Sequence, residues 1–579
     1  MKPATRVPRA HLWRAVSGVA VAALDGAIVP ITKAVEILQR HGERVVLVGH
    51  DLADIISSAA TFDVTPGLLL DTRIAARSLA LSGELKELLA LFGLVPGHSS
   101  ELQAMLEIEA LLRKEFLLAP LERSIHAHFF RVNLRGVNVN AAEAAQAAQT
   151  AAVERQWVIA STVGMGLPDP RSPDSKIIQF ILERTRIQLG SLSRKSAERA
   201  LALHRTPSLD LIIGPRDQLR ALDHTIACCD AISQARGPVR PLLVGGGCST
   251  GRAAPNMSNG ARLNIQGLRR DAVASVRVRR LIVPPEGRNF CAVDLSQIEA
   301  RITAWLCGEA RLMALFAKGD DVYRGVGERV APGLPTRLSR VLGKQAVLGL
   351  GFGMGSAAFV DWVNLAAPQA EQSAIMGVYD QFHMMFPRIA EGRRELFASF
   401  AAAHAGRPAG ACGVEFAPRD EGPEKTIVVK LPTGRPLFYR SVENTAGRYY
   451  GSSRLGAKSP GEHERLCPDG VMRRDVTAPR LIENIVQAIA RDIVFHQIIE
   501  LEEAGYPVAF SVHDEIVCLA PKCTCPQKFW GYHRDDRCCW LQCLQTMTAV
   551  MARVPSTLPG LRGLSLACQV RTEVRRTYA

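Results

Sequence analysis

The sequence predicts an α/β protein of several domains. Its 579 residues exceed the roughly 250–300 at which one hydrophobic core usually divides into several. Short apolar runs typical of buried strands alternate with stretches that carry apolar residues at helical spacing. No apolar run reaches the roughly 18–20 residues of a membrane helix; the nearest, residues 15–31, is interrupted by Asp25 and Pro30. We therefore expect no membrane-spanning segment.

Charge and cysteine usage narrow the class of protein. The net charge of +14 favours an anionic partner, with nucleic acid first, although a solvated basic surface without a partner stays open. Of the 14 cysteines, seven lie at or after Cys518 and the others are scattered. This distribution is unlike the framework of a secreted disulfide-rich domain, so we expect a cytoplasmic protein.

The N-terminal region is predicted to form an α/β layer. Apolar runs at residues 44–51 and 68–72 are typical of buried strands, and the second leads into a predicted helix at residues 73–81. Residues 85–92 and 101–118 have the periodicity of amphipathic helices.

The remainder alternates between helical and strand-like segments. The pattern is helical over residues 119–235 and again over 304–403, strand-like over 426–440, and helical over 480–503. Residues 177–203 carry Arg and Lys at helical spacing, which suits a phosphate backbone but is more often a solvated helix face.

A carboxylate stands at the end of one buried strand. The apolar run that begins at Phe290 ends at Asp294. Ser296 and Glu299 then fit a capping box that begins a helix. A carboxylate in this place can hold a metal ion, although a strand-to-helix junction with a capping Asp is the ordinary alternative.

A second carboxylate lies at the tip of a predicted hairpin. Apolar runs flank the triplet His513-Asp514-Glu515 within residues 509–519. Two strand-borne aspartates from distant segments can meet in one sheet and share two divalent cations. Oxygen-rich sites of this kind suit Mg²⁺, and two such ions can activate the attacking oxygen and stabilise the leaving one.

A third segment carries cations at helical spacing. Arg340, Lys344, Leu348 and Phe352 are four residues apart, so a helix places them along one face. Two cations followed by an apolar and an aromatic residue suit a nucleoside triphosphate; a plain amphipathic helix before a glycine-rich loop is the alternative. The glycines at 349, 351, 353 and 355 would let the helix hinge or end there.

The three segments together resemble the family A DNA polymerases, the DNA polymerase I type. Asp294-Leu-Ser-Gln-Ile-Glu-Ala-Arg301 is similar to the first palm motif of that family, Arg340-x3-Lys344-x7-Phe352-Gly353 to its fingers-helix motif, and Val512-His-Asp-Glu515 to its second palm motif. Secondary matches extend the resemblance over about 340 residues, and residues 431–435 and 483–492 are most similar to the bacteriophage and prophage branch.

The resemblance implies a right-hand polymerase with a role for each matching residue. Two Mg²⁺ ions would be held by Asp294, Asp514 and the backbone carbonyl of Leu295. Arg340 and Lys344 would be catalytic and would bind the triphosphate of a dNTP. The dNTP site would also include Gln297, Glu299 as the gate against a ribose 2′-hydroxyl, Tyr323, Leu348 and Phe352, and primer-template DNA would contact Arg252, Gln266, Gln487 and His513.

The implied domains follow the chain in order. They are a degenerate exonuclease-like domain (1–118), a thumb (119–240), the first part of the palm (241–305), the fingers (306–425) and the second part of the palm (426–579) with an insertion at 521–540. The implied setting is a bacterial cell or a phage-infected host, with any processivity or replisome partner left open.

Departures from the family motifs keep a second function open. Leu295 replaces the usual Tyr, Leu348 the usual Phe or Tyr, Phe352 the usual Tyr, and Gly267 the usual Asn. They favour a catalytically lapsed polymerase that binds DNA as a scaffold, whereas the retained aspartates and the Arg-Lys pair oppose it. A single-subunit RNA polymerase shares the palm, but Glu299 and Glu515 argue against it.

The N-terminal region resembles an RNase H-like 3′–5′ exonuclease domain. The similarity lies in residues 70–79 with 85–88 and in residues 133–140. The first strand lacks an Asp-x-Glu, Leu24-Asp25-Gly26-Ala27 being the nearest run, and Gln103 and Glu107 replace the usual Tyr-x3-Asp. We expect proofreading to be lost because a two-metal nuclease needs its acidic cluster.

The insertion is rich in cysteine. Cys523, Cys525, Cys538 and Cys539 could make a structural Zn²⁺ site, although their spacing differs from the common CxxC pattern and a reduced loop is the other reading.

Overall fold

The computed structural model describes five strands within residues 1–119, most of residues 120–571, and Tyr578. Within residues 120–571 the undescribed positions are 194–195, 198–199, 202–203, 205, 241–242, 245–249, 256–262, 270, 320, 368–369, 422–423, 446–447, 453–463, 467–471 and 523–538.

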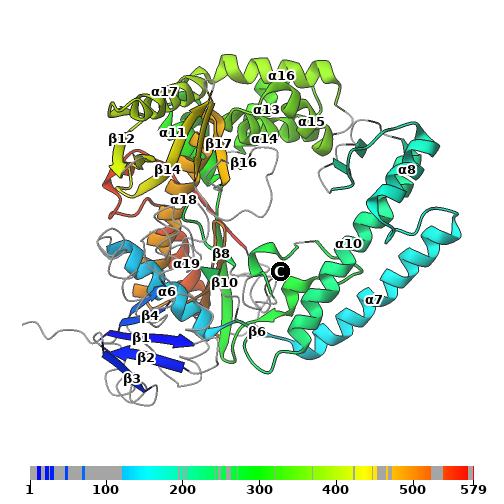
Figure 1. The fold of residues 1–579 in the computed structure, drawn as a ribbon, viewed down its shortest axis with the longest axis horizontal. Helices are drawn as coiled ribbons and strands as arrows, with labels where there is room; N and C mark the ends of the chain where they lie inside the picture. The colour runs from blue at the N-terminus through cyan, green and yellow to red at the C-terminus, as the bar shows by residue number, and fades with distance from the viewer. Residues whose placement is uncertain are drawn as a thin grey trace, which may run out of the picture.

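The N-terminal strands form one mixed sheet at the lower left of Figure 1. Its order is β3-β2-β1-β4-β5, with β1 antiparallel to β2 and parallel to β4. The strands are β1 (Arg9–Arg14), β2 (Ala20–Leu24), β3 (Ala27–Pro30), β4 (Val46–Gly49) and β5 (Leu68–Asp71). The predicted strands at 44–51 and 68–72 are confirmed as β4 and β5. The helices predicted at 73–81, 85–92 and 101–118 lie outside the described residues, as do Asp25, Gln103 and Glu107.

Two long helices extend to the right of Figure 1 and lie side by side, with α8 near their outer end. These are α7 (Ala141–Gly164), α8 (Asp174–Thr185) and α10 (Pro207–Ser233). Arg155 of α7 pairs with Asp223 of α10 at 2.6 Å, and the outer end has its own apolar cluster around Ile181 and Leu209. The preceding α6 (Pro120–Arg135) packs elsewhere, with Phe129 edge-on to Phe495 at 5.2 Å. The predicted helical character of 119–235 is confirmed in α6, α7, α8 and α10. The helical spacing predicted over 177–203 does not continue as one helix, because α8 ends at Thr185, Arg186 is left-handed and the described residues 186–193 are not helical.

The centre of the molecule is a four-stranded antiparallel sheet with order β18-β19-β10-β20. Its strands are β10 (Arg288–Leu295), β18 (Val508–Val512), β19 (Glu515–Pro521) and β20 (Cys568–Val570). Helices α11 (Ile298–Leu306), α18 (Ala478–Glu503) and α19 (Cys539–Met551) pack around the sheet. The predicted hairpin at 509–519 and the predicted helix at 480–503 are confirmed as β18–β19 and α18.

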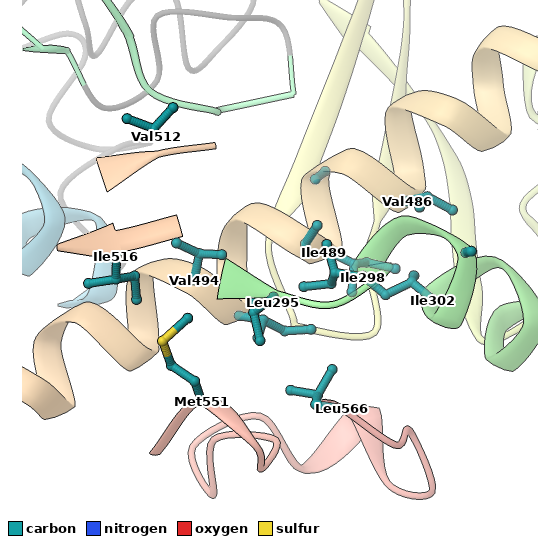
Figure 2. Close-up of a cluster of buried hydrophobic side chains, with 14 of the residues drawn as sticks. Leu295, Ile298, Ile302, Val486, Ile489, Val494, Val512, Ile516, Met551 and Leu566 are labelled. Atoms are coloured by element: carbon teal, nitrogen blue, oxygen red, sulfur yellow. The ribbon is translucent and has the colours of Figure 1, made fainter. Parts of the chain in front are cut away.

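An apolar cluster joins the end of β10 to α11 and α18 (Figure 2). Figure 2 labels Leu295, Ile298, Ile302, Val486, Ile489, Val494, Val512, Ile516, Met551 and Leu566. These side chains come from segments far apart in the sequence, so their burial holds the strand that carries Asp294 against the rest of the core.

Six helices and a π-helical turn stand above this core in Figure 1. They are α12 (Ala310–Ala317), α13 (Val322–Val330), α14 (Thr336–Gln345), the π-turn η4 (Ala346–Leu350), α15 (Ser356–Ala366), α16 (Gln372–Met385) and α17 (Pro387–His404). α13 and α14 approach closely where Gly327 and Gly343 meet: a Cβ on Gly343 would lie 2.1 Å from the carbonyl oxygen of Tyr323.

A seven-stranded antiparallel sheet follows, with order β11-β12-β13-β14-β15-β17-β16. The strands are β11 (Ala409–Ala411), β12 (Val414–Glu421), β13 (Glu424–Lys430), β14 (Pro436–Thr445), β15 (Arg448–Ser452), β16 (Glu464–Leu466) and β17 (Met472–Val476). This sheet runs across the predicted fingers–palm boundary at 425, because β12 pairs with β13.

Short elements complete the description. They are β6 (Asn138–Val139), β7 (Leu243–Val244), β8 (Ala254–Pro255) and β9 (Ile282–Val283), with 3₁₀ turns at Ile265–Gly267, Val278–Leu281 and Pro559–Leu561. Among the described helices, none combines the length and apolar character that crossing a bilayer requires.

Candidate active site

Asp294 and Asp514 occupy neighbouring strand ends. The last antiparallel pair of β10 and β19 is Asp294 with Glu515, and the N–H of Leu295 donates to the carbonyl oxygen of Asp514 over 3.1 Å. Antiparallel pairing places residues in adjacent strands about 5 Å apart, so the two predicted carboxylates come together. Gln297, three residues after Asp294, and His513, directly before Asp514, have φ values of 53° and 56°. Such left-handed backbone is costly for non-glycine residues and is concentrated at functional sites.

Burial and like charge raise the pKa of Asp514 to about 6. Desolvation is the larger cause and the Asp294 carboxylate the second, while Arg252 lowers the pKa. Two carboxylates that resist ionising together are stabilised by a cation between them, and carboxylate oxygens are the ligands that Mg²⁺ prefers. The donor set therefore fits a divalent cation.

The guanidinium of Arg571 pairs with Asp294. Its Nη2 contacts Asp294 Oδ2, with side-chain exposures of 31% and 15%, and its backbone N–H donates to the carbonyl oxygen of Ala292 over 2.9 Å. Sequence reasoning missed Arg571, because it lies in a basic C-terminal stretch and nothing local relates it to Asp294.

The capping box predicted for Ser296 and Glu299 is wrong. Helix α11 begins at Ile298, its N-cap is Gln297 without a side-chain capping bond, and the Ser296 N–H donates to the carbonyl oxygen of Ala567 over 2.8 Å. The Glu299 carboxylate instead pairs with Arg252 Nη2 at 2.5 Å, with both side chains about one quarter exposed. The tertiary partner outcompetes the local cap because a guanidinium carries a full positive charge, whereas a backbone N–H carries only a partial one.

Three of the four residues predicted to contact DNA line one pocket. Arg252, Gln266 and His513 surround it together with Asp514. The fourth, Gln487, is on α18, where its amide donates to Glu483 at 3.1 Å. The N–H of Gly267, beside Gln266, donates to Asn264 Oδ1 over 3.1 Å, so Asn264 supplies the local polar contact in this turn.

The side chains of the predicted cationic stripe lie on one face of the helix, although a π-helical turn interrupts the α-helical geometry. Arg340 and Lys344 are exposed and Leu348 and Phe352 are half-buried, whereas most neighbouring residues are buried. The π-turn at Ala346–Leu350 lies within the stripe. The helix ends at Gly353, whose φ is +89°; its N–H and that of Met354 donate to the carbonyls of Leu350 and Gly349 in a Schellman pattern. The prediction that the glycines end the helix is confirmed.

Arg340 is already paired with a carboxylate. Its Nε donates to Asp321 Oδ2 at 2.5 Å, with exposures of 48% and 36%, and its guanidinium lies 6.0 Å from the ring centre of Tyr323. An ion pair this exposed is weak, so a triphosphate can displace it. Burial raises the pKa of Tyr323 to about 12, with smaller contributions from Asp514 and Glu299. Tyr323 thus lies within the electrostatic range of the carboxylate site.

Leu295 and Leu348, two of the residues that depart from the family motifs, have different surroundings. Leu295 is 1% exposed and lies in the apolar cluster of Figure 2, so only its backbone faces the site. Leu348 is half-buried on the stripe and presents no hydroxyl.

Sequence reasoning also did not predict the buried ionic network around Asp492. Asp492 is fully buried and accepts from Arg435 Nε at 2.7 Å, Arg491 Nη1 at 2.9 Å and Thr433 Oγ1 at 2.6 Å. The two arginines also donate to the carbonyls of Thr250 and Gly251. This network fixes the backbone immediately before Arg252.

The Zn²⁺ hypothesis is untested at three of its four cysteines. Cys523, Cys525 and Cys538 lie outside the described residues, and Cys539 is exposed at the start of α19. Within the described part of the chain, no cluster of three or more metal-ligating side chains is present.

Similarity to known proteins agrees with this geometry. The family model "DNA polymerase family A" matches residues 194–404, which include Asp294, Arg340 and Lys344. The "DNA polymerase" of Bacillus phage SP02 is 28% identical over 264 residues. Residues 194–404 of this chain thus resemble the family A DNA polymerases.

A bacterial protein also matches part of this chain. "DNA polymerase I, thermostable" of Thermus aquaticus is 26% identical over 253 residues. These alignments cover 43% and 42% of this chain but only 38% of the phage protein and 24% of the Thermus protein, so the chain matches well under half of either relative. The solved "POL domain of Pol1 from M. smegmatis complex with DNA primer-template and dNTP" superposes with a TM-score of 0.67 at 16% identity, over 99% of this chain and 95% of that one. That likeness supports a shared fold.

Proposed function

We propose that this chain is a DNA-directed DNA polymerase that adds dNTPs to the 3′ end of a primer on a template strand. The observation that carries the proposal is the pairing of β10 with the β18–β19 hairpin, which brings Asp294 and Asp514 together. The phage relative is described as a DNA polymerase, and the M. smegmatis structure holds primer-template DNA and dNTP.

The proposed mechanism is phosphoryl transfer at the two aspartates. Asp294, Asp514 and the Leu295 carbonyl would hold two Mg²⁺ ions, which when bound activate the attacking oxygen and stabilise the leaving one. Arg340 gives up Asp321 for the triphosphate, and Lys344 neutralises the phosphates and protonates the leaving pyrophosphate. Positioning and charge neutralisation supply most of the catalysis in such reactions.

Other residues select the substrates. Glu299, held by Arg252, stands against a ribose 2′-hydroxyl, with Gln297 beside the sugar. Tyr323 contacts the phosphates, and Phe352 and Leu348 lie toward the base. Arg252, Gln266, Gln487 and His513 contact primer and template. The roles of Arg252, Gln266 and His513 draw support from the pocket that they share with Asp514.

The alternative is a lapsed polymerase that binds DNA as a scaffold. Four motif substitutions favour it, namely Leu295, Leu348, Phe352 and Gly267. The burial of Leu295 weakens this argument, because an apolar residue is what the site around it requires.

Primer extension separates the two functions. A labelled primer-template with Mg²⁺ and either dNTPs or rNTPs should be extended by the wild type with dNTPs only, and not by Asp514→Ala. Asp380→Ala, which removes an exposed carboxylate on α16, is the matched control and should extend normally. No extension by the wild type would favour the scaffold function, and equal extension by Asp514→Ala would contradict catalysis at Asp514.

We also propose that the N-terminal region is a degenerate exonuclease domain without proofreading. The mixed sheet β3-β2-β1-β4-β5 supports an α/β layer there, and the absent acidic pattern supports the loss of activity. A mismatched primer incubated with Mg²⁺ and no dNTP should keep its length. Shortening from the 3′ end would show an active nuclease.

A further inference from the structure

The C-terminal strand brings a cation to the carboxylate site. β20 pairs with β10 in the register Val293 with Val570 and Leu295 with Cys568, so Arg571, just after β20, lies opposite Ala292. The side chain of Arg571 crosses diagonally to Asp294, two residues along β10. Diagonal neighbours in a sheet lie within reach of a long side chain.

The guanidinium of Arg571 makes fewer hydrogen bonds than that of Arg435 in the network around Asp492. Its guanidinium contacts Asp294 through Nη2, while its Nε is buried and lacks a hydrogen-bond partner in the described part of the chain. Arg435, by contrast, donates to Asp492 and to the carbonyls of Thr250 and Ala488. A guanidinium with one carboxylate contact and 31% exposure can leave its partner at a modest cost, whereas Arg435 cannot.

The ion pair with Arg571 occupies Oδ2 of Asp294, an oxygen that the proposed function requires for binding a metal ion. Asp294 Oδ2 accepts from Arg571, and the neighbouring Asp514 lies within the same electrostatic environment. A divalent cation that binds Asp294 must share this oxygen with the guanidinium or displace it. The guanidinium and a divalent cation therefore compete for this oxygen, and the positive charge of Arg571 opposes the binding of the metal.

We propose that Arg571 is a built-in, exchangeable counter-ion of Asp294. Without a divalent cation it neutralises the carboxylate and holds the end of β20 on β10. When the cation binds, the guanidinium releases Asp294, so Arg571 lowers the affinity of the site for divalent cations. Arg571 is a positioning residue in this scheme, and the inference rests on the proposed function for its assignment of Asp294 as a ligand.

Direct Mn²⁺ binding tests the proposal without DNA or nucleotide. Electron paramagnetic resonance of free Mn²⁺, titrated with the full chain, should show roughly tenfold tighter binding for Arg571→Gln than for the wild type, as removal of one close positive charge predicts. Arg571→Lys should stay near the wild type, and Asp294→Asn should lose the site. Arg553→Gln is the matched control, because it removes an exposed arginine that pairs with Glu500.

Thermal unfolding of the same variants measures the other half of the exchange, the stabilisation of the metal-free protein by Arg571. Metal-free Arg571→Gln should melt below the wild type, because the carboxylates lose their counter-ion, and should gain more stability from added Mn²⁺. Should Arg571→Gln not fold, the wild type alone still tests the exchange. Its rate of Arg571 modification by phenylglyoxal, measured by peptide mass spectrometry, should rise when Mn²⁺ is added, with Arg553 as the internal reference.

Equal or weaker Mn²⁺ binding by Arg571→Gln, or an unchanged rate of Arg571 modification, would overturn the counter-ion role. Failure of the proposed function gives a different result. In that case Mn²⁺ binding would still tighten in Arg571→Gln, while neither protein would extend a primer.

Discussion

The N–H of Leu295 donates to the carbonyl oxygen of Asp514 over 3.1 Å, and this bond joins the end of β10 to the turn of a distant hairpin. Both residues at the junction are then constrained: Leu295 is 1% exposed within the apolar cluster, and Asp514 is bounded by the paired strands β18 and β19. The bond thus sets the separation of the two proposed metal carboxylates.

The first prediction concerns the pH dependence of stability. The pKa of Asp514 is raised from 3.8 to about 6, so between these values the folded chain binds more protons than the unfolded chain. The free energy of unfolding therefore falls as pH rises through this window, and the whole penalty is present above about pH 6. Metal-free Asp514→Asn should be more stable than the wild type at about pH 8, by up to ~3 kcal/mol.

Urea unfolding in a chelator at about pH 8 and about pH 4 measures this difference. The advantage of Asp514→Asn should shrink toward zero at the lower pH, where the wild-type carboxyl is protonated. An advantage that is the same at both pH values would show that its cause is not the charge of Asp514.

The second prediction concerns the sugar gate. Glu299→Ala removes the carboxylate that Arg252 holds at 2.5 Å, leaving room for a ribose 2′-hydroxyl. The ratio of rNTP to dNTP insertion should rise, by roughly 10²-fold if the gate supplies the discrimination typical of a single hydroxyl. Single-nucleotide insertion kinetics measure the ratio. Glu328→Ala, on the exposed side of α13, should leave it unchanged; an unchanged ratio in Glu299→Ala would remove Glu299 from the gate.

The third prediction compares two glycines of the segment formed by α14 and the π-turn η4. Gly343→Ala places a Cβ 2.1 Å from the carbonyl oxygen of Tyr323, so α13 and α14 must move apart. Overpacking of this kind destabilises a fold by roughly 1–3 kcal/mol. Gly351→Ala, directly after the π-turn η4 and with nothing within 4 Å of its added Cβ, should instead be neutral or stabilising by up to ~1 kcal/mol. Chemical unfolding compares the two; equal effects would contradict the close approach of α13 and α14.

The fourth prediction concerns the network at Asp492. Asp492→Asn leaves the buried Arg491 and the partly buried Arg435 without their shared carboxylate, so we expect a loss of about 3–5 kcal/mol. Glu415→Gln breaks an exposed pair with Lys430 and should lose less than about 1 kcal/mol. Urea unfolding of both variants tests the difference. A mild effect of Asp492→Asn would mean that water or rearrangement satisfies the arginines.

Much of the site could be predicted because its signals are local. An apolar run followed by Asp294, a polar triplet between two apolar runs, and cations four residues apart each follow from the geometry of one strand, one hairpin or one helix. The strands, the hairpin and the glycine-ended helix are present where these patterns place them. Roles carried by the resemblance, such as the gate and the DNA contacts, stay predictions.

The tertiary structure alone decided which charges meet. Local spacing predicted that Glu299 caps the start of its own helix. In the structure Glu299 instead pairs with Arg252, which comes from another segment. Arg571 reaches Asp294 only because β20 lies against β10, and no pattern near either residue records that contact. Helical and strand periodicity is a property of neighbouring residues, so the sequence by itself determined the elements and the chemical groups on them. Ion pairs between distant segments depend on strand register and helix packing, which only the folded chain establishes.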